Sequence, residues 1–498
     1  EFSDWSSDVC SSDLLKADLS NLEECFPASL SQEQRAVAKT TFYKELAEKV
    51  HKFYHGKIQI MPKCTLAGFN WFNAYYTPGV SRISTNIRDD NDSSLYYSLR
   101  GNFVGVVSDS TRVLGDGDVT PPGGLGVMEG KSLLMKYLGG IDAVPICIDS
   151  KNKEGKNDPD AVIEFVQRIQ HTFGAINLED ISQPNCYKIL DVLRETCDIP
   201  VWHDDQQGTA SVTLAGLLNA LKLVNKKIED CRMVFIGAGA ANTTCLRLIV
   251  TAGADPKKIV MFDTKGSLHN GREDIKADTR FYRKWEICET TNPEKFGSIE
   301  EAIKGADVLI SLSKCGPGVV LPEWIKSMGT KPIVFCCANP VPEIYPYEAK
   351  EAGAYIVATG RGDFPNQVNN SVGFPGILKG ALIVRARKIT DNMAIAASRA
   401  LAEFAEKRGI NPDNIIGTMD EPGIFPKEAA DVAMQAIKDG VARVTDLTWQ
   451  QVYDIAEKDI KESRESAQLL MKEKHIADFP QELLDQSLEF AINKVTKN

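Results

Sequence analysis

Met233-Val-Phe-Ile-Gly-Ala-Gly-Ala-Ala-Asn242 places four apolar residues directly before a turn made of glycine and alanine. The residues that follow include Leu246, Leu248 and Ile249 at helical spacing. Small side chains in such a turn let the backbone approach a pyrophosphate, and the N-terminus of the helix supplies unpaired N–H groups and the positive end of its dipole. The stretch therefore predicts a strand, a phosphate-binding turn and a helix.

A carboxylate completes this dinucleotide pattern. Asp263 lies about 20 residues after the turn, at the end of the next apolar run, where a carboxylate can accept hydrogen bonds from ribose hydroxyls. The third glycine position holds Asn242, so either the helix and strand pack less closely or the Asn242 side chain contacts phosphate. The alternative is a tight turn that binds nothing. The predicted dinucleotide residues are Gly237, Ala238, Gly239, Ala240, Ala241, Asn242, Asp263 and Lys265.

The choice between NAD and NADP depends on two charges near the predicted ribose site. Asp263 would repel a 2′-phosphate and favours NAD, whereas Lys265 could neutralise such a phosphate. We expect NAD to be preferred, with NADP as the alternative.

The apolar runs indicate an α/β fold. Downstream of Ile236 the runs Ile259–Phe262, Val308–Ser311 and Ile333–Phe335 are separated by segments of helix length. Strands that are apolar along their whole length are typical of a parallel sheet covered on both faces. Upstream, between Gly101 and Asp205, shorter runs alternate with helical patterns, which indicates a second α/β lobe. Beyond Gly376 the pattern is mostly helical.

We expect the following organisation of the chain. Residues 1–14 are rich in Ser and Asp without helical or strand periodicity, and we interpret them as a non-native scar. An N-terminal α/β domain that binds substrate and metal covers 15–206. A Rossmann-type, doubly wound parallel-sheet domain covers 207–385, and a helical C-terminal segment covers 386–498.

Composition excludes several classes of protein. A formal net charge of −11 disfavours nucleic acid as a partner, because binding phosphates needs a concentrated basic surface. No run approaches the ~18 apolar residues of a membrane-spanning helix, and no secretory leader is apparent. We expect a cytoplasmic location, with organelle targeting left open. The 12 cysteines include no Cys-x-x-Cys pair, which favours reduced thiols over disulfides or structural zinc.

Two predicted strands end in carboxylates. Ala175-Ile-Asn-Leu-Glu-Asp180 and Ile199-Pro-Val-Trp-His-Asp-Asp205 each place acids directly after an apolar run. Because the carboxyl ends of neighbouring parallel strands face the same cleft, Glu179, Asp180 and Asp205 can converge. Oxygen ligands in small number suit Mg²⁺ or Mn²⁺. The alternative is a pair of solvated acidic turns.

Two further residues could move protons. Lys131 follows a loop rich in Gly and Pro and opens an apolar run, so burial could lower its pKa and make it a base. Tyr76 lies beside a proline turn and could act as a phenolic acid. The alternatives are an ordinary exposed lysine and a core aromatic residue.

From about Asn73 to at least Arg385, the chain resembles the malic enzymes, in the form of their shorter, bacterial-type branch. Several separate motifs carry this resemblance in the same order, namely Tyr75–Val80, Val127–Lys131, Leu178–Asp180, His203–Ala210, Gly237–Ala241, Cys337–Pro340 and Asn366–Gly376. The resemblance implies oxidative decarboxylation of (S)-malate to pyruvate and carbon dioxide, reduction of NAD(P), dependence on a divalent metal, and a homodimer or higher oligomer.

The resemblance also implies roles for individual residues. Lys131 would be the general base for the C2 hydroxyl, with Asp204 beside it, and Tyr76 would be the acid that protonates C3. Glu179, Asp180 and Asp205 would hold the metal. Asn339 and Asn370 would contact the substrate, and Asn339 would also contact the cofactor. Arg112 matches an arginine that grips a malate carboxylate in longer members and that the shorter branch usually lacks.

Asn270 stands where NADP-preferring relatives commonly have lysine, which also favours NAD. Two other hypotheses about the function remain. One is a metal-independent dehydrogenase with two domains, and the other is a nucleotide-binding regulator without activity.

Overall fold

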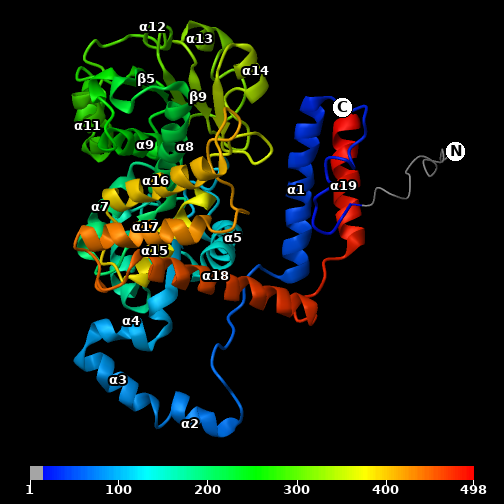
Figure 1. The fold of residues 1–498 in the computed structure, drawn as a ribbon, viewed down its shortest axis with the longest axis vertical. Helices are drawn as coiled ribbons and strands as arrows, with labels where there is room; N and C mark the ends of the chain where they lie inside the picture. Colours follow the sequence, from blue (N-terminus) through cyan, green and yellow to red (C-terminus); the bar gives the residue numbers. More distant parts are fainter. Residues whose placement is uncertain (1–14, 498) are drawn as a thin grey trace, which may run out of the picture. The chain divides into compact units, whose positions relative to one another are not determined.

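The computed structural model describes residues 15–497. It divides into two compact units, one made of Glu1–Met61 with Glu465–Asn498 and the other of Pro62–Arg464. Figure 1 draws both units, and each is described separately below. None of the helices among residues 15–497 is long and apolar enough to cross a membrane.

The first unit is built on two long helices. α1 (Gln32–Tyr54) and α19 (Gln481–Thr496) lie side by side, and both contribute to one small apolar cluster with Leu22 and Phe26. Ser31 caps α1 in a reciprocal capping box with Gln34.

The second unit begins with a four-stranded parallel sheet in the order β2-β1-β3-β4. Parallel pairing requires crossover connections, and α5, α6 and α7 connect successive strands. The strands are β1 (Phe103–Ser108), β2 (Asp142–Cys147), β3 (Ala175–Leu178) and β4 (Val201–His203), and the helices are α5 (Pro121–Gly139), α6 (Pro159–Ile169) and α7 (Asn185–Thr196). The predicted N-terminal α/β lobe is confirmed.

A second sheet follows in the order β10-β9-β8-β5-β6-β7. All pairs are parallel except β6 with the two-residue β7, which form a short hairpin. The strands are β5 (Met233–Ile236), β6 (Ile259–Asp263), β7 (Gly266–Ser267), β8 (Val308–Ser311), β9 (Ile333–Cys336) and β10 (Ile356–Thr359). The predicted doubly wound sheet is confirmed, whereas the reversal at β7 was not foreseen.

Helices cover both faces of this sheet. The segments between the strands contain α9 (Ala240–Thr251), α10 (Glu273–Ala277), α11 (Tyr282–Thr290), α12 (Ile299–Ala302), α13 (Pro322–Ser327) and α14 (Pro346–Glu351). α8 (Thr209–Val224) precedes β5 and is buried along most of its length. One apolar core runs from the first sheet through α8 to the second sheet, so the two lobes share their interior.

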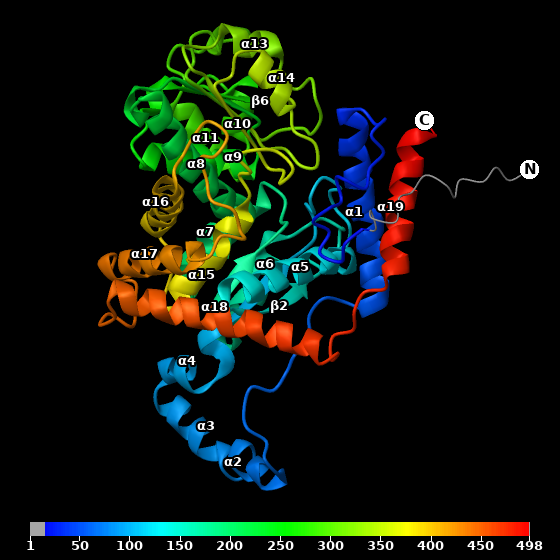
Figure 2. The ribbon, with the colours of Figure 1, turned by 45° about the vertical axis from the view of Figure 1, so that its right-hand side comes forward.

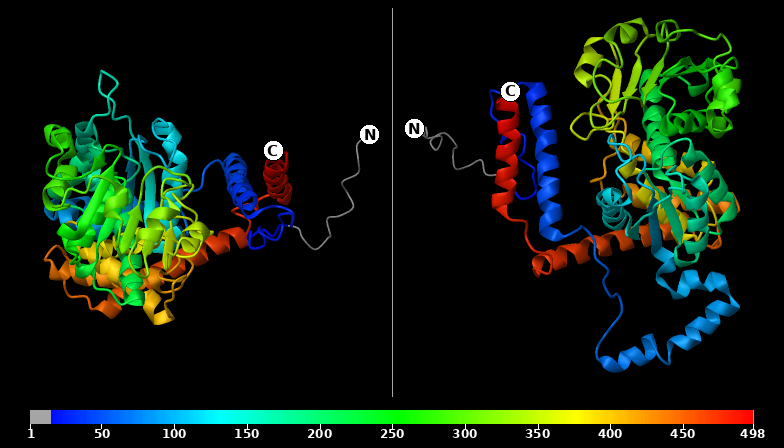
Figure 3. Two further views of the ribbon diagram at one scale, coloured as in Figure 1. Left: turned by 90° about the horizontal axis from the view of Figure 1, so that it is seen from above. Right: turned by 180° about the vertical axis from the view of Figure 1, so that it is seen from behind.

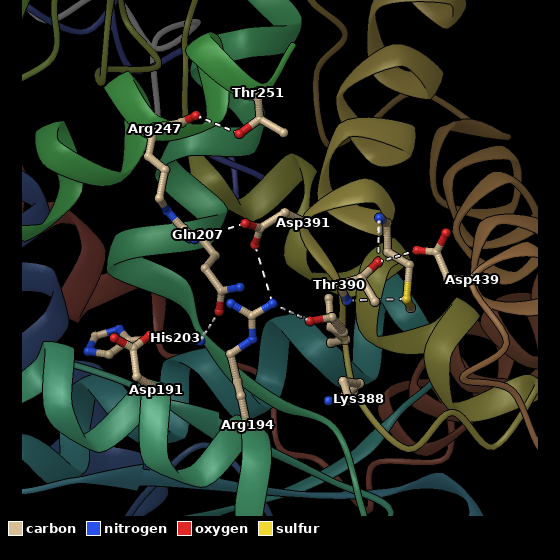
Figure 4. Close-up of polar contacts among 12 residues, drawn as sticks. Asp191, Arg194, His203, Gln207, Arg247, Thr251, Lys388, Thr390, Asp391 and Asp439 are labelled. Carbon is tan, nitrogen blue, oxygen red and sulfur yellow. Dashed lines mark hydrogen bonds and ion pairs between the residues drawn. The ribbon is translucent and has the colours of Figure 1, made fainter. Parts of the chain in front are cut away.

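The helical C-terminal segment packs on both lobes of this unit. It contains α15 (Phe374–Ile383), α16 (Asp391–Arg408), α17 (Ile424–Lys438) and the part of α18 (Trp449–Lys472) that ends at Arg464. Asp391, at the start of α16, accepts hydrogen bonds from Arg194 of α7 at 3.3 Å and from Arg247 of α9 at 2.8 Å (Figure 4). This carboxylate ties the lobe of the first sheet to the lobe of the second sheet.

An arm precedes β1 and stands apart from the rest of this unit. We define the arm as residues 69–97, which contain α2 (Phe72–Tyr75), α3 (Val80–Asp89) and α4 (Ser94–Tyr97). Neither α2 nor α3 buries a residue. In Figure 2 both helices lie away from α5 and β2, and the view from behind in Figure 3 agrees.

Candidate active site

Lys131 lies buried on α5 between two carboxylates. Its Nζ atom is 2.6 Å from Oδ2 of Asp204 and 3.0 Å from Oε1 of Glu179, and it lies 4.4 Å from the ring centre of Phe374. Burial lowers the pKa of Lys131, but attraction to Asp204 and then to Glu179 outweighs burial and leaves the pKa above its usual range. The sequence predicted this lysine and its aspartate partner, and the structure brings them into contact.

Three carboxylates converge beside this pair. Glu179, Asp180 and Asp205 each offer an oxygen, and these oxygens all lie within 4.8 Å of one another. The convergence follows from the sheet, because β3 pairs with β4 in parallel and the acids follow the ends of both strands. Burial and then the charge of Asp205 raise the pKa of Asp180 to about 8. Carboxylates this close repel one another unless they share protons or a cation.

The carboxylate cluster fits a divalent metal. Oδ2 of Asp180 is buried and has no hydrogen-bond partner among the described residues. All the candidate donors are oxygens, as Mg²⁺ and Mn²⁺ prefer, and the set is small enough to leave positions for substrate and water.

Two residues that the sequence analysis missed orient the carboxylates of Glu179 and Asp204. Asn177 donates from Nδ2 to Oε2 of Glu179 at 2.8 Å, and Trp202 donates from Nε1 to Oδ1 of Asp204 at 3.2 Å. In each pair the two residues are two positions apart, at the end of a strand, where they share a face. The spacing of two positions before each acid could have identified Asn177 and Trp202 from the sequence. Such hydrogen bonds fix the direction of a carboxylate and so preorganise the site.

His203 is buried at the end of β4, where its Nδ1 atom lies 3.7 Å from Oδ2 of Asp205, and it is not part of the three-carboxylate cluster. Burial lowers its pKa to about 3, so the imidazole is neutral, and neither ring nitrogen has a hydrogen-bond partner among the described residues. Its backbone N–H donates to Oε1 of Gln207 at 3.1 Å (Figure 4).

The structure brings Asn370 and Arg112 to the same site. A Cβ atom on Gly208 would lie 2.0 Å from Oδ1 of Asp204 and 3.3 Å from Cβ of Asn370, so Asn370 and Asp204 both lie next to this glycine. The backbone N–H of Arg112 donates to the carbonyl of Asp180 at 2.9 Å, and the charge of its exposed guanidinium opposes part of the rise that burial causes in the pKa of Asp180.

Asn339 is exposed on the loop after β9. A Cβ atom on Gly360 would lie 2.8 Å from its Nδ2 atom, and one on Gly115 would lie 3.7 Å from its carbonyl oxygen. The Asn339 loop therefore lies between the dinucleotide lobe and the loop that follows Arg112.

A glycine turn joins β5 to α9, at the position where the sequence predicted phosphate binding. Gly237 has φ of +93°, and a Cβ atom there would lie 2.5 Å from the carbonyl oxygen of Leu312, so the turn requires glycine. Gly239 is the N-cap of α9 without a side-chain cap, and a Cβ atom on it would meet open space. The side chain of Asn242 is buried and donates to the carbonyls of Ile236 and Gly237 at 3.0 and 2.7 Å, so it braces the turn.

At the end of β6, Asp263 is engaged by a residue that the sequence analysis did not single out. Arg272 donates from both terminal nitrogens to Asp263, at 3.0 and 2.9 Å, and the backbone N–H of Lys265 donates to the same carboxylate at 2.8 Å. The ammonium of Lys265 lies instead 3.3 Å from Asp274. Arg272 offsets much of the charge by which Asp263 would repel a 2′-phosphate.

Tyr76 is the predicted site residue that the structure leaves apart. It ends α2 on the arm and is 71% exposed. Among the described residues, Lys131 makes its polar contacts with the carboxylates of Glu179 and Asp204, and Tyr76 makes none with it.

With this geometry in place, similarity to known proteins identifies the chain. A family model for the malic enzyme N-terminal domain matches residues 55–194, and one for the malic enzyme NAD binding domain matches residues 206–437. Together they cover more than half of the chain.

The chain belongs to the malic enzyme family.

Malic enzymes of known sequence and structure are similar to it over most of its length. The NAD-dependent malic enzyme of Geobacillus stearothermophilus is 42% identical over 78% of this chain and 78% of its own. The NADP-dependent malic enzyme of Halomonas elongata is 41% identical over 74% of this chain and 87% of its own. A crystal structure of Entamoeba histolytica malic enzyme is 92% identical, covers 97% of this chain and 100% of that one, and superposes with a TM-score of 0.95.

These matches confirm the predicted family, its shorter branch and its reaction. The malic enzyme described here oxidatively decarboxylates malate to pyruvate with reduction of NAD or NADP.

Proposed function

We propose that this malic enzyme depends on a divalent metal held by Glu179, Asp180 and Asp205, and that Lys131 is its general base. The observation that supports this most strongly is the position of Glu179, whose carboxylate contacts Lys131 at 3.0 Å and belongs to the three-carboxylate cluster. A single substrate could therefore reach both the base and the metal.

Lys131 would take the proton of the malate C2 hydroxyl as the hydride leaves C2 for the nicotinamide. Asp204 holds the lysine in place through a hydrogen bond of 2.6 Å, and Trp202 holds Asp204. A cation on the nearby carboxylates would compete for their charge and lower the pKa of Lys131, which favours the neutral, basic form.

The bound metal would supply Lewis-acid stabilisation of the negative charge that develops as carbon dioxide departs. Asn370 and Arg112 would contact the malate carboxylates; the proximity of Asn370 to Asp204 and of Arg112 to Asp180 supports this. Asn339 is assigned to substrate and cofactor. Tyr76 would protonate C3 of the enolate, so that the C=C electron pair forms the new C3–H bond and the C2 carbonyl is restored.

For the cofactor we propose that the pyrophosphate lies at the turn Gly237–Asn242, against the free N-terminus of α9. We propose NAD as the preferred cofactor because Asp263 lies at the end of β6, where an acid can accept hydrogen bonds from the ribose hydroxyls. Since Arg272 neutralises part of its charge, we expect NADP to be accepted as well, with a lower kcat/KM. We also propose that the enzyme is a homodimer and that it is located in the cytoplasm.

The test is the initial rate of pyruvate formation from malate with Mn²⁺, measured with NAD and with NADP. We expect turnover that EDTA abolishes and added Mn²⁺ restores. Turnover that survives exhaustive chelation would contradict the metal assignment and favour a metal-independent dehydrogenase. A chain that binds dinucleotide without any turnover would be a regulator.

A further inference from the structure

A cavity of about 360 Å³ lies among three helices that come from both lobes. α7 belongs to the lobe of the first sheet, whereas α9 and α11 belong to the lobe of the second sheet. None of the described residues that line the cavity belongs to the three-carboxylate cluster or to the turn Gly237–Asn242. Its volume falls within the range of small-molecule sites, which often lie between lobes. A molecule bound there would contact both lobes at once.

The lining of this cavity combines apolar side chains with guanidinium groups. Arg247 of α9 and Arg283 of α11 supply the guanidinium groups. The apolar part includes Leu190, Leu246, Val250 and Ile287. Such a lining suits a ligand that has an apolar body and one charged group.

Arg247 leaves most of its hydrogen-bonding capacity unused. Among residues 15–497 its guanidinium makes one hydrogen bond, from Nη1 to Asp391 at 2.8 Å (Figure 4), although it carries five N–H donors. Asp391 also accepts a hydrogen bond from Arg194, so one carboxylate serves two arginines. Burial lowers the pKa of Arg247, and the charges of Arg283 and Arg194 lower it further. The cavity therefore offers an incompletely neutralised arginine to a small anion.

The other charged groups of the cavity are paired with one another. Arg283 donates from Nη2 to both carboxylate oxygens of Asp191 at 2.8 Å and from Nη1 to Glu286 at 2.9 Å. Asp191 and Glu286, the two acids in the lining, are thus both engaged by the same arginine. The unused donors belong to Arg247, so the cavity favours an anion over a cation.

The cavity also touches the turn that carries two acids of the active site. Gln206 lines the cavity and belongs to the π-helical turn Asp204–Gly208, which follows β4. Asp204 contacts the proposed base, and Asp205 belongs to the three-carboxylate cluster. Nε2 of Gln206 donates to the carbonyl of Cys186 at 3.3 Å, which ties the turn to α7. A ligand that contacts Gln206 would therefore act on the turn that positions both acids.

We propose that this cavity is a regulatory site for a small organic acid, with the carboxylate of the ligand at Arg247 and its apolar body against the apolar lining. Bound there, the ligand would contact Gln206 and both lobes, so it would favour one arrangement of the turn and slow malate oxidation without excluding malate. Because Asp204 and Asp205 act here through their proposed roles, the inference rests on the proposed function.

Calorimetry with naphthoate, an aromatic carboxylate, tests the site directly. The full chain is titrated in the presence of Mn²⁺ and without dinucleotide, so that no turnover takes place. We expect a Kd of about 1 mM or below. Naphthamide has the same rings without the charge and should bind at least about tenfold more weakly. Saturating malate should leave the Kd for naphthoate unchanged.

Two variants remove the proposed contacts in different ways. Arg247→Gln removes the charge, whereas Val250→Phe fills part of the cavity and keeps the charge. Each should raise the Kd for naphthoate by at least about tenfold. Arg168→Gln, on the exposed face of α6, is the matched charge control and should bind naphthoate as wild type does. Thermal unfolding of each variant checks that the chain is folded.

The initial rate of malate oxidation measures the regulatory effect. Saturating naphthoate should lower kcat several-fold and leave the KM for malate unchanged. Absence of binding, displacement of naphthoate by malate, equal affinity in wild type and both cavity variants, or an unchanged kcat would each overturn the inference. Turnover that survives chelation would instead contradict the metal assignment and leave the naphthoate titration unaffected, so the two failures are distinguishable.

Discussion

The backbone N–H of Asp180 donates a hydrogen bond to Oδ2 of Asp205 at 2.7 Å. This contact joins the end of β3 to the turn that follows β4, and it holds two acids together although their charges repel. The carboxylate cluster is thus formed by the backbone of the sheet before any ligand arrives, which is what a preorganised metal site requires.

Asp205→Asn should weaken metal binding. The variant keeps a hydrogen-bond acceptor for Asp180 but removes one of the three negative charges. We expect the Kd for Mn²⁺, measured by calorimetry or electron paramagnetic resonance, to rise by at least about tenfold, which is a typical effect of substituting a residue around a bound metal. Glu164→Gln, on the exposed face of α6, is the control and should bind Mn²⁺ as wild type does. Unchanged affinity in Asp205→Asn would remove Asp205 from the site.

The metal-free enzyme should lose stability as the pH rises toward 8. Burial, with the charge of Asp205 second, raises the pKa of Asp180 from 3.8 to about 8 in the folded state. The folded state therefore holds this proton more tightly than the unfolded chain. The resulting stability is fully present below about pH 4 and is lost as the pH rises through about 8.

Thermal unfolding between about pH 6 and pH 8.5 measures this loss. We expect the Tm of the metal-free wild type to fall across the range, and the Tm of Asp180→Asn to fall less. Saturating Mn²⁺ should also reduce the loss, because the cation stabilises the charged carboxylates. If wild type and Asp180→Asn follow the same pH dependence, Asp180 does not carry a raised pKa.

Much of this architecture could be predicted from the sequence, and the exceptions have physical reasons. Strands buried on both faces read as apolar runs, so β5, β6, β8 and β9 were recognisable, and acids directly after neighbouring parallel strands were expected to meet. The hairpin at β7 was not, because two residues leave no periodic pattern.

The functional residues that sequence analysis missed depend on tertiary contacts. Arg272 lies in a loop beyond β7, and only the folded chain brings its guanidinium to Asp263. The position of Tyr76 was equally hidden, since its motif predicts a chemical role and says nothing about which site the side chain enters. Asn177 could have been found from its spacing to Glu179.

Arg272→Gln should change cofactor selection. The bidentate pair with Arg272 offsets the charge of Asp263, so its loss should expose that charge to a 2′-phosphate. We expect kcat/KM for NADP to fall about tenfold more than kcat/KM for NAD, which corresponds to about 1.4 kcal/mol. Arg280→Gln, whose exposed side chain pairs with Asp278, serves as the control. Equal losses with both cofactors would indicate that Arg272 only stabilises the loop.

The central claim is that Lys131 is the base that starts the reaction. The most direct measurement is the initial rate of malate oxidation by Lys131→Ala with Mn²⁺, together with dinucleotide affinity from fluorescence. We predict a rate about a thousandfold below wild type with unchanged dinucleotide affinity, while Lys136→Ala, on the same helix and exposed, stays active. A Lys131→Ala enzyme that retains a substantial part of the wild-type rate would contradict this account.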